Sequence, residues 1–215
     1  MADVSLQLVR EFFELNLFQT LTNWQQEPWR ERVPEHSPQM FLQNTRTVSM
    51  REPAFVLPPE ELPLIERAVV EVRAWHADRF YPSVIEANPV LFQFAEESAL
   101  ALAREVFAGQ PFVTILILSE LPVSAEQRRR AVSLLQAANI NHVMEFPAIL
   151  QDLLHKVSAN VAYPSPTLQT LRLLKRYKFI RHQQMELPFA VEPTLPFPAP
   201  FVETAPVEPD SSSED

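Results

Sequence analysis

The sequence predicts an α/β domain in which a central mixed sheet is flanked by helices, followed by a disordered C-terminal tail. Segments with the two-residue period of a strand alternate with segments of helical period through the middle of the chain, which is typical of strands joined by crossover helices. Residues 112–118 form an almost wholly apolar run rich in β-branched side chains, as expected of a strand covered on both faces. Residues 68–76 form a second candidate strand, with one carboxylate and one guanidinium among its valines.

Helical and extended segments are both predicted in the first part of the chain. In order, they are a helix over 4–24, a hairpin of extended segments over 38–42 and 45–50 that turns at Gln43 and Asn44, a helical turn bracketed by Pro58, Pro59 and Pro63, and a strand over 69–75. The helix is predicted because apolar residues recur at helical spacing. The turn is predicted because proline suits the first residues of a helix.

Helices and strands alternate in the second part. The predicted elements are a helix over 89–107, a strand over 112–118, a helix over 125–138, a strand over 141–146, and helices over 148–160 and 167–179. Gly109 lies where a glycine commonly ends a helix. Ser124 is a candidate N-cap, since Gln127 follows three residues later.

The length of 215 residues suits one domain with a tail. We expect a single domain over residues 1–186, because 47% of the chain is hydrophobic and this is ample for a core. Residues 187–215 are dominated by Pro, Glu and Ser, a composition that predicts disorder.

Composition excludes several classes of function. The chain has no cysteine, so it has neither a disulfide framework nor a thiolate metal site. Its single glycine excludes the glycine-rich loops that hold the phosphates of nucleotides. No charge-free apolar run is long enough for a bilayer, and the first residues lack the pattern of a signal peptide, so we expect a cytoplasmic protein without membrane contact.

The net charge of −9 is unevenly distributed. After Pro188 there are six acidic residues and no Lys or Arg, whereas the last predicted helix has a basic face. Lys and Arg on such a face bind phosphates and release counterions. The candidate nucleic-acid-binding residues are therefore Arg172, Lys175, Arg176 and Lys178. The alternative is an amphipathic helix whose polar face is simply solvated.

Glu71 and Arg73 point to the same face of their strand, because side chains alternate along a strand. Val70 and Val72 then point to the opposite face, into a core. Burying a carboxylate and a cation is costly unless they pair, hold a metal or meet an anionic ligand. A structural ion pair is one explanation of the two residues, and a functional site is the other.

The order of these elements, together with Pro38-Gln39 and Glu71-Val72-Arg73, resembles the restriction-endonuclease-like superfamily of PD-(D/E)xK nucleases, in a degenerate bacterial form. Members open with a helix, present an Asp near one strand and place Glu-x-Lys on the next. A helix, a buried strand, another helix and a further strand follow. The resemblance covers residues 4–154 and implies a restriction-endonuclease-like core.

The resemblance implies a site in which two carboxylates hold Mg²⁺, which activates water beside the scissile phosphate. Glu71 matches the second carboxylate and would be the metal ligand. Gln39 stands where the Asp belongs, and its amide oxygen carries no charge. Arg73 replaces the lysine; its guanidinium stays protonated and cannot act as a base, although it can bind a phosphate. Carboxylates or amides that could be recruited in place of the missing Asp are Glu66, Glu86, Gln93 and Glu120.

Three functions follow as expectations. The first is a nuclease-derived domain that binds DNA, another nucleic acid or a protein partner without efficient cleavage, and so is not an enzyme. The second is an active Mg²⁺-dependent nuclease that uses Glu71 and a recruited carboxylate. The third is a structural or protein-interaction module acting through the basic helix and the Pro-rich tail.

Overall fold

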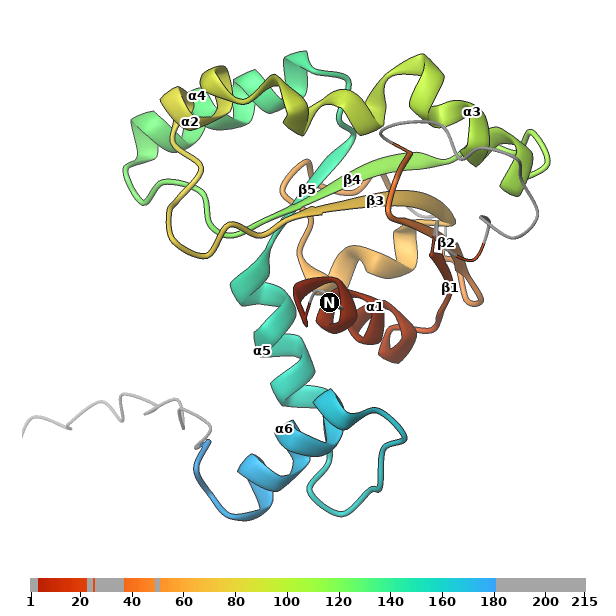
Figure 1. The fold of residues 1–215 in the computed structure, drawn as a ribbon, viewed down its shortest axis with the longest axis vertical. Helices are drawn as coiled ribbons and strands as arrows, with labels where there is room; N and C mark the ends of the chain where they lie inside the picture. Colours follow the sequence, from red (N-terminus) through yellow and green to blue (C-terminus); the bar gives the residue numbers. More distant parts are fainter. Residues whose placement is uncertain (1–3, 23–24, 26–36, 49–50, 181–215) are drawn as a thin grey trace, which may run out of the picture. The chain divides into compact units, whose positions relative to one another are not determined.

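A five-stranded mixed sheet forms the centre of the structure (Figure 1). The computed structural model describes residues 4–22, 25, 37–48 and 51–180. The strands follow sequence order across the sheet: β1 Phe18–Thr22, β2 Met40–Asn44, β3 Arg67–Arg73, β4 Val113–Leu118 and β5 His142–Glu145. The pairs β1–β2 and β2–β3 are antiparallel, whereas β3–β4 and β4–β5 are parallel. β3, the strand that carries Glu71, is therefore the central strand.

Helices cover both faces of the sheet, with α1 and α5 below it and α2, α3 and α4 above it in Figure 1. The helices are α1 Val4–Leu15, α2 Pro82–Ala87, α3 Glu97–Val106, α4 Ala125–Ala137, α5 Phe146–Lys156 and α6 Pro166–Arg176. The 3₁₀ helices η2 Pro59–Leu64, η3 Pro89–Leu91 and η4 Gln93–Ala95 also lie in the part of the chain that the structure describes. The α/β class, with a mixed sheet between helices, is thus confirmed.

The alternation of side chains along β3 determines what each face contains. Val70 and Val72 lie in the core beneath α1, together with Phe12 and Phe13. Val69 lies in the core on the opposite face, which α3 covers. Glu71 and Arg73 follow Val69 at two-residue spacing and so face the side of α2, α3 and α4.

The first predicted helix is wrong at its C-terminal end, because residues 4–24 contain both α1 and β1. Asn16 donates its side-chain amide to the carbonyl of Phe12, and Leu17 adopts a positive φ of 67°, so the helix stops there. β1 then pairs antiparallel with β2 at the edge of the sheet. Its apolar residues continue the spacing of the helix, which concealed the strand.

The predicted hairpin at Gln43 and Asn44 is also wrong. β2 runs through both residues, and its partners are β1 on one side and β3 on the other. The Asn44 side chain is buried and donates to the carbonyls of Leu62 and Ile65, so it connects the end of β2 to η2. Residues 49–50 of the second extended segment lie outside the described residues.

The predicted helix over 89–107 is broken into shorter pieces. After α2, the chain forms η3 and η4, and α3 begins only after Glu96, whose backbone is extended at φ −71° and ψ 152°. Gly109 has a φ of 77° just beyond α3, in agreement with its predicted place. The helical turn at 59–64 is confirmed as η2.

The remaining elements agree with prediction to within a few residues. Ser124 is the residue before α4, although its side chain makes no capping hydrogen bond. No helix among the described residues is long and apolar enough to cross a membrane. The tail predicted over 187–215, and the boundary placed at residue 186, lie outside the part of the chain that the structure describes.

Candidate functional site

The structure brings Gln39, Glu71 and Arg73 together at the centre of the sheet. Gln39 immediately precedes β2, and its neighbour Met40 lies opposite Val70 on β3. The side-chain oxygen of Gln39 accepts a hydrogen bond of 3.0 Å from the backbone N–H of Val72. The amide oxygen that replaces the expected carboxylate is therefore bound to the neighbouring strand.

Glu71 is buried, with 3% of its surface exposed, and it forms an ion pair with Arg73. The Nη2 atom of Arg73 lies 2.7 Å from Oε1 of Glu71. Burial raises the pKa of Glu71 to about 7, while the charge of Arg73 and a hydrogen bond from the backbone of Gln39 act in the lowering direction. Loss of hydration is thus the largest effect on this carboxyl group.

Two polar atoms of this pair have no hydrogen-bond partner among the described residues. They are Oε2 of Glu71 and Nε of Arg73. The side-chain oxygen of Gln93 on η4 is likewise buried without a partner. A buried polar atom without a hydrogen-bond partner costs free energy. Glu71 and Arg73 can therefore each form one further hydrogen bond.

The residues present do not fit a Mg²⁺ site. No group of three or more His, Asp or Glu side chains that could hold a metal ion is found in the described ranges, and a site of the expected kind needs a second carboxylate beside Glu71. The carboxylates considered for recruitment are each paired with an arginine: Glu66 with Arg67, Glu86 with Arg130, and Glu120 with Arg79. Glu71 therefore stands as a single carboxylate beside a cation.

The basic residues of α6 do not share a surface with Glu71. Leu168 of α6 packs into the core beneath α1, which lies on the other face of the sheet. Lys175 donates to the carbonyls of Leu154 and Val157 at 2.7 and 2.5 Å, so it caps the C-terminal end of α5. Lys175 is thus a structural residue and Arg172 is half-buried, so that Arg176 and Lys178 are the exposed cations of the predicted set.

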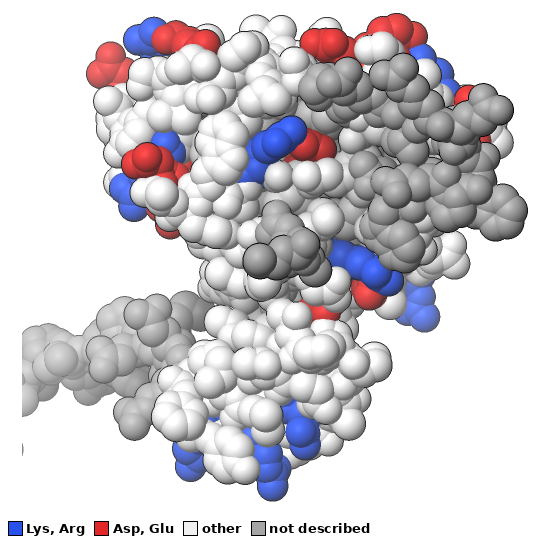
Figure 2. All heavy atoms as spheres, in the orientation of Figure 1, with Lys and Arg blue, Asp and Glu red and all other residues white. Residues whose placement is uncertain are grey.

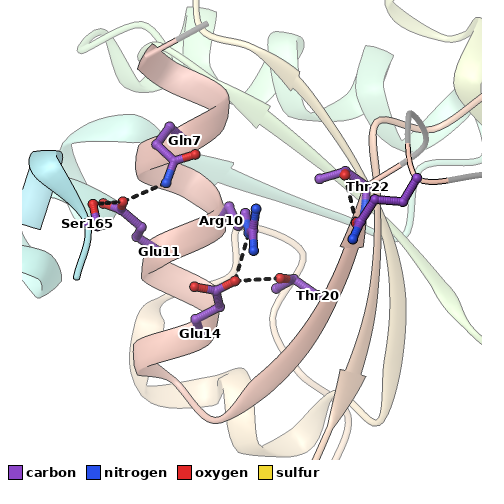
Figure 3. Close-up of polar contacts among 8 residues, drawn as sticks. Gln7, Arg10, Glu11, Glu14, Thr20, Thr22 and Ser165 are labelled. Atoms are coloured by element: carbon purple, nitrogen blue, oxygen red, sulfur yellow. Dashed lines mark hydrogen bonds and ion pairs between the residues drawn. The ribbon is translucent and has the colours of Figure 1, made fainter. Parts of the chain in front are cut away.

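The other end of α6 is fixed to α1 (Figure 3). Ser165 is the N-cap of α6, since its hydroxyl oxygen accepts from the backbone N–H groups of Thr167 and Leu168. The same hydroxyl donates to the buried carboxylate of Glu11, which also accepts from Gln7. α6 is therefore held at both ends, which fixes its orientation against α1 and α5.

The C-terminal end of α6 and the turn that follows it combine cations with exposed apolar side chains. Leu173, Tyr177 and Phe179 have 45%, 68% and 80% of their surface exposed. Arg176 and Lys178 lie between them in sequence. Figure 2 shows only Lys and Arg, and no acidic residues, at the lower rim of the molecule where α6 lies. Cations beside exposed aromatic rings are typical of surfaces that bind single-stranded nucleic acid.

A pocket that we did not predict lies at the carboxyl ends of β3, β4 and β5. Its volume is about 500 Å³, and its lining residues are His76, Ala77, Asp78, Arg79, Tyr81, Ser119, Glu120, Phe146, Pro147 and Leu150. The signal that could have found it is topological, because ligands of open α/β sheets bind beyond the carboxyl ends of parallel strands. The predicted crossover helices implied the parallel pairing of β3 with β4 and of β4 with β5.

The described residues define an α/β domain with a mixed five-stranded sheet covered by helices on both faces. Comparison of the chain with models of known protein families, with curated proteins and with solved structures finds no match. The function of the chain is therefore inferred from its own residues and their contacts.

Proposed function

We propose that the chain is a degenerate nuclease-like domain of the restriction-endonuclease-like class, which binds nucleic acid without cleaving it. The order of elements supports the class: a helix opens the domain, Gln39 precedes one strand, and Glu71 and Arg73 lie on the next. A helix, a buried strand, another helix and a further strand follow. This is the order that the resemblance implies.

The observation that carries the loss of cleavage is the pairing of the motif residues with one another. The guanidinium of Arg73 occupies one carboxyl oxygen of Glu71 at 2.7 Å, and the Gln39 oxygen is bound by the backbone N–H of Val72. A hydrolytic site would instead require these positions to hold a cation and to activate water. A guanidinium cannot take up a proton from water, because its pKa is far above neutrality.

The C-terminal end of α6, with the turn that follows it, is the proposed binding surface. Arg176 and Lys178 would contact phosphates, while Tyr177 and Phe179 offer rings on which unpaired bases stack. Single strands are favoured as the ligand because their bases are accessible to aromatic side chains. Lys175 does not contribute, since its ammonium group is bound by carbonyls of α5.

Fluorescence anisotropy of labelled single-stranded and duplex oligonucleotides tests this function. We expect binding of single strands at low salt, weakened by added salt and weakened at least tenfold in the double variant Arg176→Ala/Lys178→Ala. Loss of two phosphate contacts should reduce the slope of log affinity against log salt concentration by about 1.4. Arg104→Ala, which removes an exposed arginine from α3, is the matched control.

Each outcome separates the proposal from its alternatives. Absence of binding at low salt, or equal losses in the control and the double variant, would contradict nucleic-acid binding through α6. Such a result would favour a protein-interaction module, for which the exposed Leu173, Tyr177 and Phe179 are the motivating observation. An active nuclease is favoured by one feature alone, the unpartnered Oε2 of Glu71, and is tested by cleavage.

A further inference from the structure

The pocket at the carboxyl ends of β3, β4 and β5 has the size and lining of a small-molecule site. Its volume of about 500 Å³ is within the range of roughly 300–1,000 Å³ that is usual for ligand pockets. It is separate from Glu71 and from α6, and neither of the interactions proposed above uses its residues. Phe146, Pro147 and Leu150 form an apolar wall. Tyr81 adds a partly exposed aromatic ring.

The loop that supplies most of the polar lining is fixed to the neighbouring loop. Ser119 donates its hydroxyl to the carbonyl of Asp78 at 2.7 Å, and the N–H of Phe80 donates to the carbonyl of Glu120 at 2.8 Å. The ring of His76 meets that of Phe146 edge to face, with centroids 4.7 Å apart. The backbones of the two loops are therefore held together before any ligand binds, which reduces the entropy lost on ordering the loops.

Hydrogen-bond donors and acceptors lie side by side in this pocket. Asp78 is exposed, and its carboxylate forms no hydrogen bond or ion pair with the residues that the structure describes. Arg79 donates its Nε–H to Glu120 at 2.8 Å. That hydrogen bond raises the pKa of Arg79 above its ordinary value, and the Tyr81 hydroxyl acts in the same direction. The pocket lining thus includes a carboxylate with free acceptor sites and a charged guanidinium that is bound on one side by Glu120.

A flat heterocycle with adjacent N–H donors and separate acceptors matches this arrangement. Guanine is the nucleobase that offers both, because N1–H and the N2 amino group lie together on one edge, and O6 and N7 accept hydrogen bonds from arginine on another. Its ring surface suits the wall formed by Phe146 and Leu150. Phosphate is a poorer match, since Asp78 and Glu120 would repel it.

We propose that this pocket binds an unpaired nucleobase, with guanine preferred, through the Asp78 carboxylate and the Arg79 guanidinium. The inference rests on the proposed function for the source of the base, which is a single strand held by the domain. A free nucleoside or nucleotide presents the same chemistry, so the experiment includes both sources. Nucleosides carry no phosphate and therefore report on the pocket without the basic face of α6.

Saturation-transfer NMR with guanosine, adenosine, cytidine and uridine tests the pocket in the full chain. Guanosine is expected to bind saturably and most tightly. Binding should weaken at least tenfold in Asp78→Asn and be lost in Leu150→Trp, which fills the apolar wall and keeps both charged groups. Glu97→Gln, an exposed carboxylate on α3, should bind as the wild type does. Circular dichroism of each variant shows that it is folded.

The outcomes distinguish this inference from the proposed function. If no nucleoside binds at millimolar concentration while oligonucleotides bind through α6, the pocket assignment is overturned and the proposed function stands. If guanosine binds and oligonucleotides do not, the pocket is a site for a free nucleoside and the proposed function fails. Equal guanosine binding by wild type and Asp78→Asn would refute the role of that carboxylate.

Discussion

Replacing Glu71 by glutamine is expected to remove a pH dependence from the stability of the domain. Burial favours the neutral form of this carboxyl group, so the folded state keeps its proton up to about pH 7. The unfolded chain releases the same proton near its ordinary pKa of 4.5. Between these values folding takes up a proton, and the free energy of unfolding must fall as the pH rises.

The size of the effect follows from the two pKa values. A rise from 4.5 to about 7 corresponds to about 3 kcal/mol, at about 1.4 kcal/mol for each pH unit. The contribution of Glu71 to the free energy of unfolding is therefore fully present below pH 4.5 and is lost progressively up to about pH 7. Above that pH, Glu71 adds no further pH dependence. Gln at the same position has nearly the same size and does not titrate.

Urea unfolding of wild type and Glu71→Gln at several pH values measures the effect. Subtracting the two free energies of unfolding removes the contributions of all other titrating groups. We expect the variant to gain about 3 kcal/mol relative to wild type between pH 4.5 and pH 8. Glu97→Gln, which is exposed on α3, should show no such gain. A difference that stays constant, or that falls as the pH rises, would show that Arg73 outweighs burial and would refute this reasoning.

Three other changes test the contacts around α6 and β5. Ser165→Ala removes the N-cap of α6 and should lower the free energy of unfolding by about 1–2 kcal/mol in urea titrations. A loss below roughly 0.3 kcal/mol, which is within the error of such data, would contradict the cap. Lys175→Met should lower the free energy of unfolding by about 1 kcal/mol and leave oligonucleotide binding unchanged. Arg176→Ala/Lys178→Ala should weaken binding and leave the free energy of unfolding unchanged. Equal losses of binding in the two variants would show that Lys175 contacts the ligand. Burial lowers the pKa of His142, so the contribution of this residue to the free energy of unfolding is present above pH 6.5 and is lost as the pH falls through the lowered value. The stability difference between wild type and His142→Gln should therefore shrink on acidification. A constant difference would contradict this burial effect.

The strands with the clearest composition were predictable from the sequence. β4 is almost wholly apolar and lies between two parallel neighbours, so its composition reflects burial on both faces. β3 was predictable because Val70 and Val72 alternate with Glu71 and Arg73. In both cases the signal, apolar composition in β4 and alternation in β3, extends over most of the strand, and packing against neighbouring elements agrees with local preference.

Elements set by single backbone conformations were not predictable. The end of α1 depends on the positive φ of Leu17, a conformation that is uncommon for a residue without special chemistry. The break between η4 and α3 depends on the extended backbone of Glu96. Neither residue is a glycine or proline, so tertiary contacts rather than local propensity determine where these elements end.

The candidate site was predictable in position but not in its contacts. The sequence placed Gln39 beside Glu71 and Arg73 through the order of elements. It left open whether the two charges pair with one another, and they lie 2.7 Å apart. For Lys175 the sequence prediction was a ligand contact, based on its charge, but in the structure its ammonium group caps α5. Contacts between residues far apart in sequence depend on packing that a local pattern does not contain.

Cleavage of labelled single-stranded and duplex oligonucleotides in the presence of Mg²⁺ or Mn²⁺ tests the central claim most directly, because that claim is binding without hydrolysis. The pairing of Glu71 with Arg73, and of the Gln39 oxygen with Val72, leads us to expect intact oligonucleotides with both wild type and Glu71→Ala. Metal-dependent cleavage by the wild type that is lost in Glu71→Ala would contradict the account and establish an active nuclease.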